Sequence, residues 1–325
     1  MLKMTSKKII DYITKNHQAT GKELADFLKN ISSRAVRKQL KNLLNKGYLR
    51  KIGKPPKVYY LLTENKQNLR FPIEKNIKQI IDKKYLFITP TGEEKTGWEG
   101  FVAWCKKTNQ NPGKTAKDYI ITLNKYDSFR KGGLIDGMRK IKNTFKKVFL
   151  DKLFYLDFYS IERFGKTKLG QILLYAKQSQ NKNLINRLID EIQPRILNIV
   201  KKYKIDGILF IPPTVKREVQ FMKELEKQLH LSVKILTVTK VKTFIIIPQK
   251  TLSKLEDRIE NAKRTIIVDE KNIFKNILLI DDAVGSGSTM NETAKQIRQR
   301  ELCHGQIIGL AITGSFKGFD VISEI

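Results

Sequence analysis

Residues 277–289, with the sequence ILLIDDAVGSGST, constrain the fold more than any other segment of the chain. Four apolar residues at 277–280 predict a strand that is buried on both faces. Asp281 and Asp282 follow at its carboxyl end, which is where open α/β sheets bind ligands. A Gly/Ser/Thr turn then opens a predicted helix. The segment therefore predicts a strand–loop–helix unit within an α/β domain.

The turn at residues 285–289 has the composition of a phosphate-binding loop. Backbone N–H groups at a helix N-terminus and side-chain hydroxyls are the donors that a terminal phosphate needs. The carboxylates before the turn suit the hydroxyls of a ribose attached to that phosphate. The spacing therefore predicts a sugar-phosphate site, and it excludes a Walker A loop, because the turn contains no Gly-Lys-Ser/Thr. The predicted ligands are Asp281, Asp282, Gly285, Ser286, Gly287, Ser288 and Thr289.

Apolar runs alternate with helical patterns through the rest of residues 151–325. This alternation predicts an α/β domain with a mainly parallel sheet and helices on its faces. The expected strands lie at 205–211, 233–238, 244–247, 277–280 and 307–312, and the expected helices lie at about 183–202, 215–229 and 288–300.

Residues 277–289 resemble the phosphoribosyl-pyrophosphate (PRPP) motif of type I phosphoribosyltransferases. In that family the acid pair contacts the ribose hydroxyls and the loop holds the 5′-phosphate. Ala283 stands where Val or Ile is usual, and Gly285 where Thr or Ala is usual. Both residues are small, which is compatible with phosphate binding. The alternative is a chance combination of a strand, an acid pair and a glycine turn in another α/β fold.

The resemblance extends to a basic loop after the strand expected at 205–211. In the family the corresponding loop holds pyrophosphate, which implies Lys216 and Arg217 as anion ligands; solvated surface charges are the alternative. Further residues are spaced as in the ComF branch of the family, a branch that includes proteins linked to DNA uptake. They are Lys240, Lys242, Gln249, Leu252, Arg258 and Asn261. In that branch a flexible basic segment lies over the pyrophosphate, which implies this role for Lys240 and Lys242. The resemblance also implies Mg²⁺, held mainly by PRPP without a dedicated protein site.

Residues 1–63 predict three short helices followed by a basic hairpin. A capping box is expected at residues 20–23, a third helix at 33–46, and strands at 48–52 and 57–62. This arrangement resembles a winged helix-turn-helix domain. The resemblance implies that the third helix enters the major groove of DNA and that the wing contacts the backbone or minor groove. The implied nucleic-acid ligands are Ser33, Arg34, Arg37, Lys38, Lys41, Lys54 and Lys57.

The charge of the chain points to a polyanionic partner. Of its 325 residues, 63 are Lys or Arg and 32 are Asp or Glu, so the formal net charge is +31. The first 62 residues carry 15 basic and 3 acidic side chains. Double- or single-stranded DNA is the simplest such partner, whereas codon bias or a protein-interaction module are the alternatives. Residues 64–150 form a basic connector of unknown type, mixed α+β, in which Trp98 and Trp104 are expected as core anchors rather than base-stacking platforms.

Several classes are excluded by composition. No apolar run approaches the roughly 18–20 residues of a membrane span, and the first residues lack the pattern of a secretory signal. Two cysteines, Cys105 and Cys303, cannot form a disulfide framework or a four-cysteine zinc site. We therefore expect a soluble cytoplasmic protein that does not bind membranes. Both resemblances also imply a homodimer.

The two resemblances together predict a DNA-binding protein that also binds PRPP. It would act as a PRPP-responsive regulator, or as a phosphoribosyltransferase whose acceptor is nucleic acid or a small base. A metabolic salvage phosphoribosyltransferase and a non-catalytic ComF-like DNA-processing or competence protein are the alternatives. The three histidines, His17, His230 and His304, are scattered along the chain and do not suggest a general base. Catalysis and the acceptor therefore stay open at this point.

Overall fold

The computed structural model describes residues 4–54, 56–63, 73–213, 217–241, 244–245, 247 and 249–315. The chain divides into two compact units, residues 1–71 and 72–325. Each unit has a hydrophobic core of its own.

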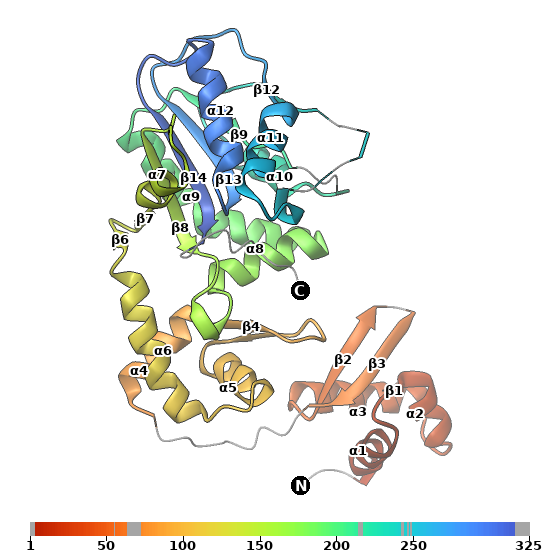
Figure 1. The fold of residues 1–325 in the computed structure, drawn as a ribbon. Coiled ribbons are helices and arrows are strands. Elements are labelled where there is room, and N and C mark those ends of the chain that lie inside the picture. The colour runs from red at the N-terminus through yellow and green to blue at the C-terminus, as the bar shows by residue number, and fades with distance from the viewer. Residues whose placement is uncertain are drawn as a thin grey trace. The chain divides into compact units, whose positions relative to one another are not determined.

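The N-terminal unit contains three helices and a small antiparallel sheet with the strand order β1-β3-β2 (Figure 1). Its elements are α1 (Met4–Asn16), β1 (Ala19–Thr20), α2 (Gly21–Phe27), α3 (Ser33–Asn45), β2 (Leu49–Lys54) and β3 (Lys57–Leu62). The predicted capping box at the start of α2 is confirmed: Thr20 Oγ1 accepts the Glu23 N–H at 3.2 Å, and the Glu23 carboxylate accepts the Thr20 N–H at 2.7 Å. The core beneath the sheet is built from apolar residues of all three helices, among them Ile9, Ile13, Leu24, Leu40 and Leu43.

The C-terminal unit is built on a seven-stranded sheet. From one edge to the other, the strands are β10 (Lys234–Ile235), β9 (Gly207–Phe210), β13 (Ile277–Val284), β14 (Ile307–Gly314), β8 (Lys152–Phe158), β7 (Leu134–Asp136) and β6 (Arg130–Lys131). The first five run parallel, and β7 and β6 add an antiparallel hairpin at one edge. The prediction of an α/β fold with a mainly parallel sheet is therefore confirmed.

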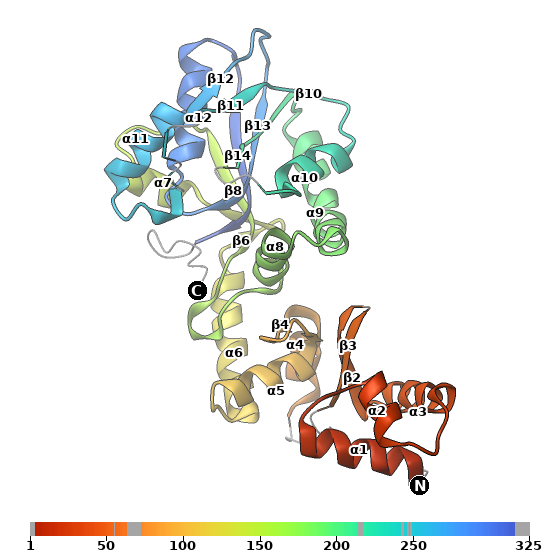
Figure 2. The ribbon, with the colours of Figure 1, turned by 90° about the vertical axis from the view of Figure 1, so that its right-hand side faces the viewer.

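Helices cover both faces of this sheet, because alternate residues of its central strands point to opposite sides. On one face, Ile277 and Leu279 of β13 join the cluster that includes α12 (Ser288–Gln299). On the other face, Leu278 and Ile280 pack with α8 (Lys168–Ser179), α9 (Lys182–Lys202) and α10 (Phe221–Leu229). Figure 2 shows α12 and the pair α9–α10 on opposite sides of the strands. The central strands are thus buried on both faces.

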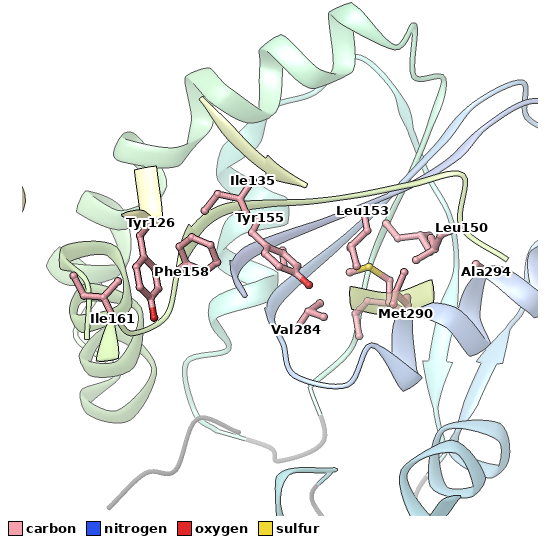
Figure 3. Packing of buried hydrophobic residues seen from close by; sticks show 14 of the residues in the cluster. Tyr126, Ile135, Leu150, Leu153, Tyr155, Phe158, Ile161, Val284, Met290 and Ala294 are labelled. Atoms are coloured by element: carbon pink, nitrogen blue, oxygen red, sulfur yellow. The ribbon is translucent and has the colours of Figure 1, made fainter. Parts of the chain in front are cut away.

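Figure 3 shows the packing that fixes α12 on the sheet. Met290, in the first turn of the helix, packs beside Leu150, which precedes β8, and Leu153 of β8. All three side chains are at most 5% exposed. Asn291 adds polar contacts here, because its Oδ1 accepts the Phe149 N–H at 2.9 Å and its Nδ2 donates to the Lys147 carbonyl at 3.1 Å. The N-terminus of α12 is therefore held rigidly.

Besides β6 and β7, the described residues between 73 and 149 contribute four helices and a second short hairpin to the C-terminal unit. These elements are α4 (Lys75–Lys84), β4 (Leu86–Ile88), β5 (Glu94–Thr96), α5 (Gly97–Lys107), α6 (Pro112–Asp127) and α7 (Met138–Thr144). Trp104 is buried, with its ring centroid 5.9 Å from that of Phe101, and Trp98 stacks on Phe101 at 5.7 Å. Both tryptophans are therefore core residues, as predicted. Within the described ranges, the structure contains no helix with the length and apolar character to cross a membrane.

A small antiparallel pair, β11 (Val238–Lys240) and β12 (Ile266–Val268), flanks α11 (Leu255–Thr265), and two short 3-10 turns lie at Glu162–Phe164 and Gln249–Thr251. The prediction of a strand at 244–247 is wrong. Phe244 and Ile245 do not belong to any strand, and their side chains are exposed. Short apolar runs resemble buried strands, and only tertiary packing distinguishes the two.

Two further boundaries differ from the prediction. The run at 233–238 divides between two strands, because β10 ends at Ile235 and β11 pairs with β12 instead of β9. The helix expected from residue 215 begins at Phe221, because residues 217–220 follow an irregular path.

Candidate functional site

The strand order places a crevice between β9 and β13. The chain leaves β9 through α10 toward β10, and it leaves β13 through α12 toward β14, so the two connections diverge. Ligands of open α/β sheets bind outside the carboxyl ends of the strands at such a divergence. A cavity of about 240 Å³ lies at this position. Its lining includes Ile211–Pro213 after β9 and residues 281–289 after the first half of β13.

The acid pair reaches this cavity because β13 extends beyond β9. Phe210, the last residue of β9, pairs with Ile280, so Asp281 and Asp282 lie past the end of their neighbouring strand. On its other side β13 continues to pair with β14, where Asp281 lies opposite Ala311. Asp281 Oδ1 accepts the backbone N–H of Asp282 at 2.8 Å. The strand pairing therefore supports the acids from one side and leaves them open to the cavity.

The loop after the acids turns sharply into α12. Gly287 precedes the first helical residue with φ +85°, a conformation that favours glycine. The hydroxyl oxygens of Ser286 and Ser288 are 2.8 Å apart, and the Ser288 N–H donates to Ser286 Oγ at 3.3 Å. Both serines and Thr289 line the cavity together with this helix N-terminus. The loop therefore directs hydroxyl groups and the positive end of the helix dipole toward one place, which suits an anion.

Four cationic side chains line the same cavity from four different segments: Lys177 of α8, Arg217 of the loop after β9, Lys240 of β11 and Arg258 of α11. Lys177 Nζ forms an ion pair with Asp282. Arg258 is only 4% exposed, and its Nε donates to the Leu252 carbonyl at 2.6 Å. Burial lowers the pKa of Arg258, but a guanidinium stays charged in proteins. Four cations facing two carboxylates give the cavity a net positive lining.

The two carboxylates and the nearby ammonium groups influence each other. Burial, followed by the adjacent charge of Asp282, raises the pKa of Asp281 to about 7. The Asp282 N–H, Lys177 and Lys240 oppose this rise. Burial lowers the pKa of Lys240, and the charge of Asp281 partly offsets that effect. Asp281 can therefore exchange a proton near neutral pH, and a ligand that requires its ionised form binds less well in acid.

The structure brings most of the predicted C-terminal site residues into one cavity. The lining residues that the sequence predicted are Arg217, Lys240, Asp281, Asp282, Gly285, Ser286, Gly287, Ser288 and Thr289. Lys216 and Lys242 lie outside the described residues. The roles of these residues stay predictions.

Two cationic residues of the cavity were not among the predicted site residues. Arg258 has the spacing of the ComF branch but no role that the resemblance implies, and Lys177 lies outside the residues that carry the resemblance. Both lie on amphipathic helices, where a basic residue usually indicates solvent exposure. Only the tertiary fold places them beside the loop.

The predicted nucleic-acid residues lie in the N-terminal unit. Val36, Leu40 and Leu43 bury one face of α3 in the core. The predicted residues on this helix that are exposed are Ser33, Arg34, Arg37, Lys38 and Lys41. The side chains of Lys54 and Lys57 lie outside the described part of the chain, although their backbones belong to β2 and β3. The helix therefore presents a basic outer face.

Comparisons with known proteins give a likeness to a solved structure over part of the chain. No protein-family model and no curated protein sequence matches the chain. The crystal structure of purine phosphoribosyltransferase from Pyrococcus horikoshii OT3 is similar to part of it, with 14% sequence identity and a TM-score of 0.24. The similar part covers 41% of this chain and 85% of that chain.

Proposed function

We propose that the C-terminal unit binds PRPP. The observation that carries this proposal is the composition of one cavity, in which an acid pair, a hydroxyl-lined helix N-terminus and four cationic side chains meet at the divergence of the sheet. A ligand with a single phosphate monoester would occupy only the loop of residues 285–289. Three of the cations, Arg217, Lys240 and Arg258, suit a ligand with a second, strongly anionic group, and the carboxylates suit hydroxyls between the two anionic groups.

Each part of PRPP has a matching group in the cavity. The 5′-phosphate would bind residues 285–289, and the ribose hydroxyls would donate to Asp281 and Asp282. Arg217, Lys240 and Arg258 would bind the diphosphate. Lys216 and Lys242 belong to the same proposal on sequence grounds.

Magnesium fits this arrangement as an ion that arrives with PRPP. Among the described residues, no group of three or more His, Cys, Asp or Glu side chains could hold a metal. Diphosphate oxygens would therefore supply most of its ligands, and it would neutralise charge on the departing pyrophosphate. The cationic side chains would stabilise the same charge, and the acid pair would orient the ribose. Histidine is absent from the residues described as lining the cavity, so the cavity supports PRPP binding more directly than it supports activation of an acceptor.

We further propose that the N-terminal unit is a winged helix-turn-helix domain that binds DNA. The order of three helices and three strands supports this proposal, as does the basic outer face of α3. With both proposals, the protein would be a PRPP-responsive DNA-binding regulator or a phosphoribosyltransferase that acts on a nucleic-acid-linked or small acceptor. Salvage of free bases and a non-catalytic role in DNA processing are the competing functions.

Two assays separate a DNA-linked phosphoribosyltransferase from a PRPP-responsive regulator. PRPP with Mg²⁺ is added to the full chain with and without duplex or single-stranded DNA, while pyrophosphate release and DNA affinity are measured. Pyrophosphate release that requires DNA as the acceptor supports an enzyme. A change of DNA affinity that depends on PRPP, without pyrophosphate release, supports a regulator. The charge-removing pair Asp281→Asn and Asp282→Asn should abolish both effects while DNA binding itself persists.

A further inference from the structure

The last turn of α8 contacts both sides of the crevice. Lys177 Nζ forms the ion pair with Asp282 on the β13 side. The carbonyl oxygen of the same residue accepts a hydrogen bond from Arg217 Nη1 on the β9 side. Gln180, in the left-handed conformation that ends the helix, accepts the Val219 N–H through Oε1 at 2.9 Å. One helical turn therefore links the acid pair to the loop after β9.

The ion pair is partly shielded from water. The side chains of Lys177 and Asp282 are 27% and 19% exposed, so solvent screens them less than a surface pair. Breaking a shielded pair leaves an uncompensated charge, which costs more than the pair contributes when it is intact. Here the charge left behind would sit beside a second carboxylate, that of Asp281. Removing the ammonium would therefore disturb both acids.

The backbone contact and the side-chain contact of Lys177 act on different parts of the cavity. Its carbonyl holds Arg217, and a substitution of the side chain leaves that carbonyl in place. Its ammonium forms an ion pair with Asp282, and its charge also opposes the rise in the pKa of Asp281. The two contributions are therefore separable by substitution.

We infer that Lys177 is a positioning residue for the pentose: its ammonium holds Asp282 in the orientation in which the carboxylate accepts ribose hydroxyls. This inference rests on the proposed function and deepens it, because it assigns a role to a residue outside the PRPP motif. Lys177 would act through Asp282 and not through direct contact with a phosphate. Its removal should weaken ligands that contain the pentose and spare ligands that consist of pyrophosphate alone.

A double-mutant cycle tests this inference on the full chain. Binding of PRPP with Mg²⁺ is measured by calorimetry for wild type, Lys177→Met, Asp282→Asn and the double variant. We expect each single variant to weaken binding about 10- to 100-fold, because each removes a charge-assisted contact. The double variant should lie within about threefold of Asp282→Asn, because the ammonium then has no Asp282 carboxylate to hold in place. Additive losses would overturn the inference.

Two controls keep this cycle decisive. Lys177→Arg retains the charge and should recover most of the affinity, whereas Lys177→Met should bind pyrophosphate with Mg²⁺ within about twofold of wild type. Equal losses for PRPP and pyrophosphate would contradict a role through Asp282. If the wild-type protein binds pyrophosphate but not PRPP, the proposed function fails and the inference falls with it. If wild type binds PRPP and Lys177→Met matches it while remaining folded, the inference alone fails.

Discussion

Arg258 lies directly against Gly285: a Cβ atom on Gly285 would be 3.6 Å from Arg258 Nη1. This is ordinary van der Waals contact, so the loop has room for a methyl group but not for a longer side chain beside the guanidinium. The space beside Gly285 therefore accommodates a buried arginine next to the loop of residues 285–289, and it would still do so with alanine at this position.

Enlarging Gly285 should therefore weaken anion binding. Gly285→Leu must displace the guanidinium, and we expect about a tenfold or greater loss of PRPP affinity, comparable to removing one charge-assisted hydrogen bond. Gly285→Ala fits the available space and should bind within about threefold of wild type. Calorimetry of the two variants measures the difference. Equal affinities for Leu and Ala would show that Arg258 does not contribute to binding.

Gly287 should tolerate no side chain, for a different reason. Its φ is +85°, and a Cβ there would be 3.1 Å from Ile141 Cδ1. We expect Gly287→Ala to lower the free energy of unfolding by about 1–2 kcal/mol, because an L-residue is strained in this conformation. Gly285→Ala is the matched control, since no positive φ is recorded there, and it should change stability by less than about 0.5 kcal/mol. Chemical denaturation compares the two, and equal stabilities would contradict the strained turn.

The ligand-free protein should lose stability as pH rises from about 4 to about 7. The pKa of Asp281 is raised from 3.8 to about 7 in the fold, so between these values the folded state binds more protons than the unfolded state. Stability falls with pH under that condition, by at most about 4 kcal/mol from this group. Asp281→Asn removes the ionisation and should be more stable than wild type at pH 8.

Denaturation curves at several pH values measure this effect. Glu260→Gln is the control, because Glu260 is a surface residue with a side chain that is 60% exposed, and its stability should follow wild type within about 0.5 kcal/mol. A pH dependence that persists in Asp281→Asn would assign the effect to another group. PRPP affinity should show the opposite trend and weaken below pH 7, because ribose hydroxyls need an ionised acceptor.

DNA binding should depend steeply on salt through the outer face of α3. Replacing Arg34, Arg37 and Lys38 by Ala should reduce the slope of log K against log salt by up to about 0.9 for each lost phosphate contact on duplex DNA. Fluorescence anisotropy at several salt concentrations measures this slope, and PRPP affinity should not change. Three exposed lysines of α1, Lys7, Lys8 and Lys15, form a charge-matched control. Equal losses from both helices would argue against a defined DNA-binding face.

The elements that were predictable from sequence are those with a strong local signal. Residues 277–289 form a strand, a turn and a helix as predicted, because buried apolar residues favour the strand and Gly287 permits the positive φ from which the helix begins. The capping box of α2 is local in the same way. The hairpin of β6 and β7 has a local signal as well, a Gly-Gly pair at Gly132 and Gly133 with positive φ at both positions.

The rest of the site depends on contacts between segments that are distant in sequence. Lys177 lies 105 positions before its partner Asp282, and no periodicity of α8 distinguishes it from a solvated lysine. The apolar run around Phe244 shows the converse error, because its composition predicts a strand although the sheet offers it no neighbour. The residues that line the cavity follow from strand order, which the local pattern of the sequence does not specify.

Titration of the full chain with PRPP and Mg²⁺ by calorimetry, alongside the Asp281→Asn/Asp282→Asn variant, tests the central claim most directly. We expect saturable 1:1 binding to wild type and none to the variant, with both proteins showing the same circular dichroism spectrum and DNA affinity. Wild-type protein that releases no heat and gains no thermal stability with PRPP, or a folded variant that binds as tightly as wild type, would contradict a pentose-phosphate site at the end of β13.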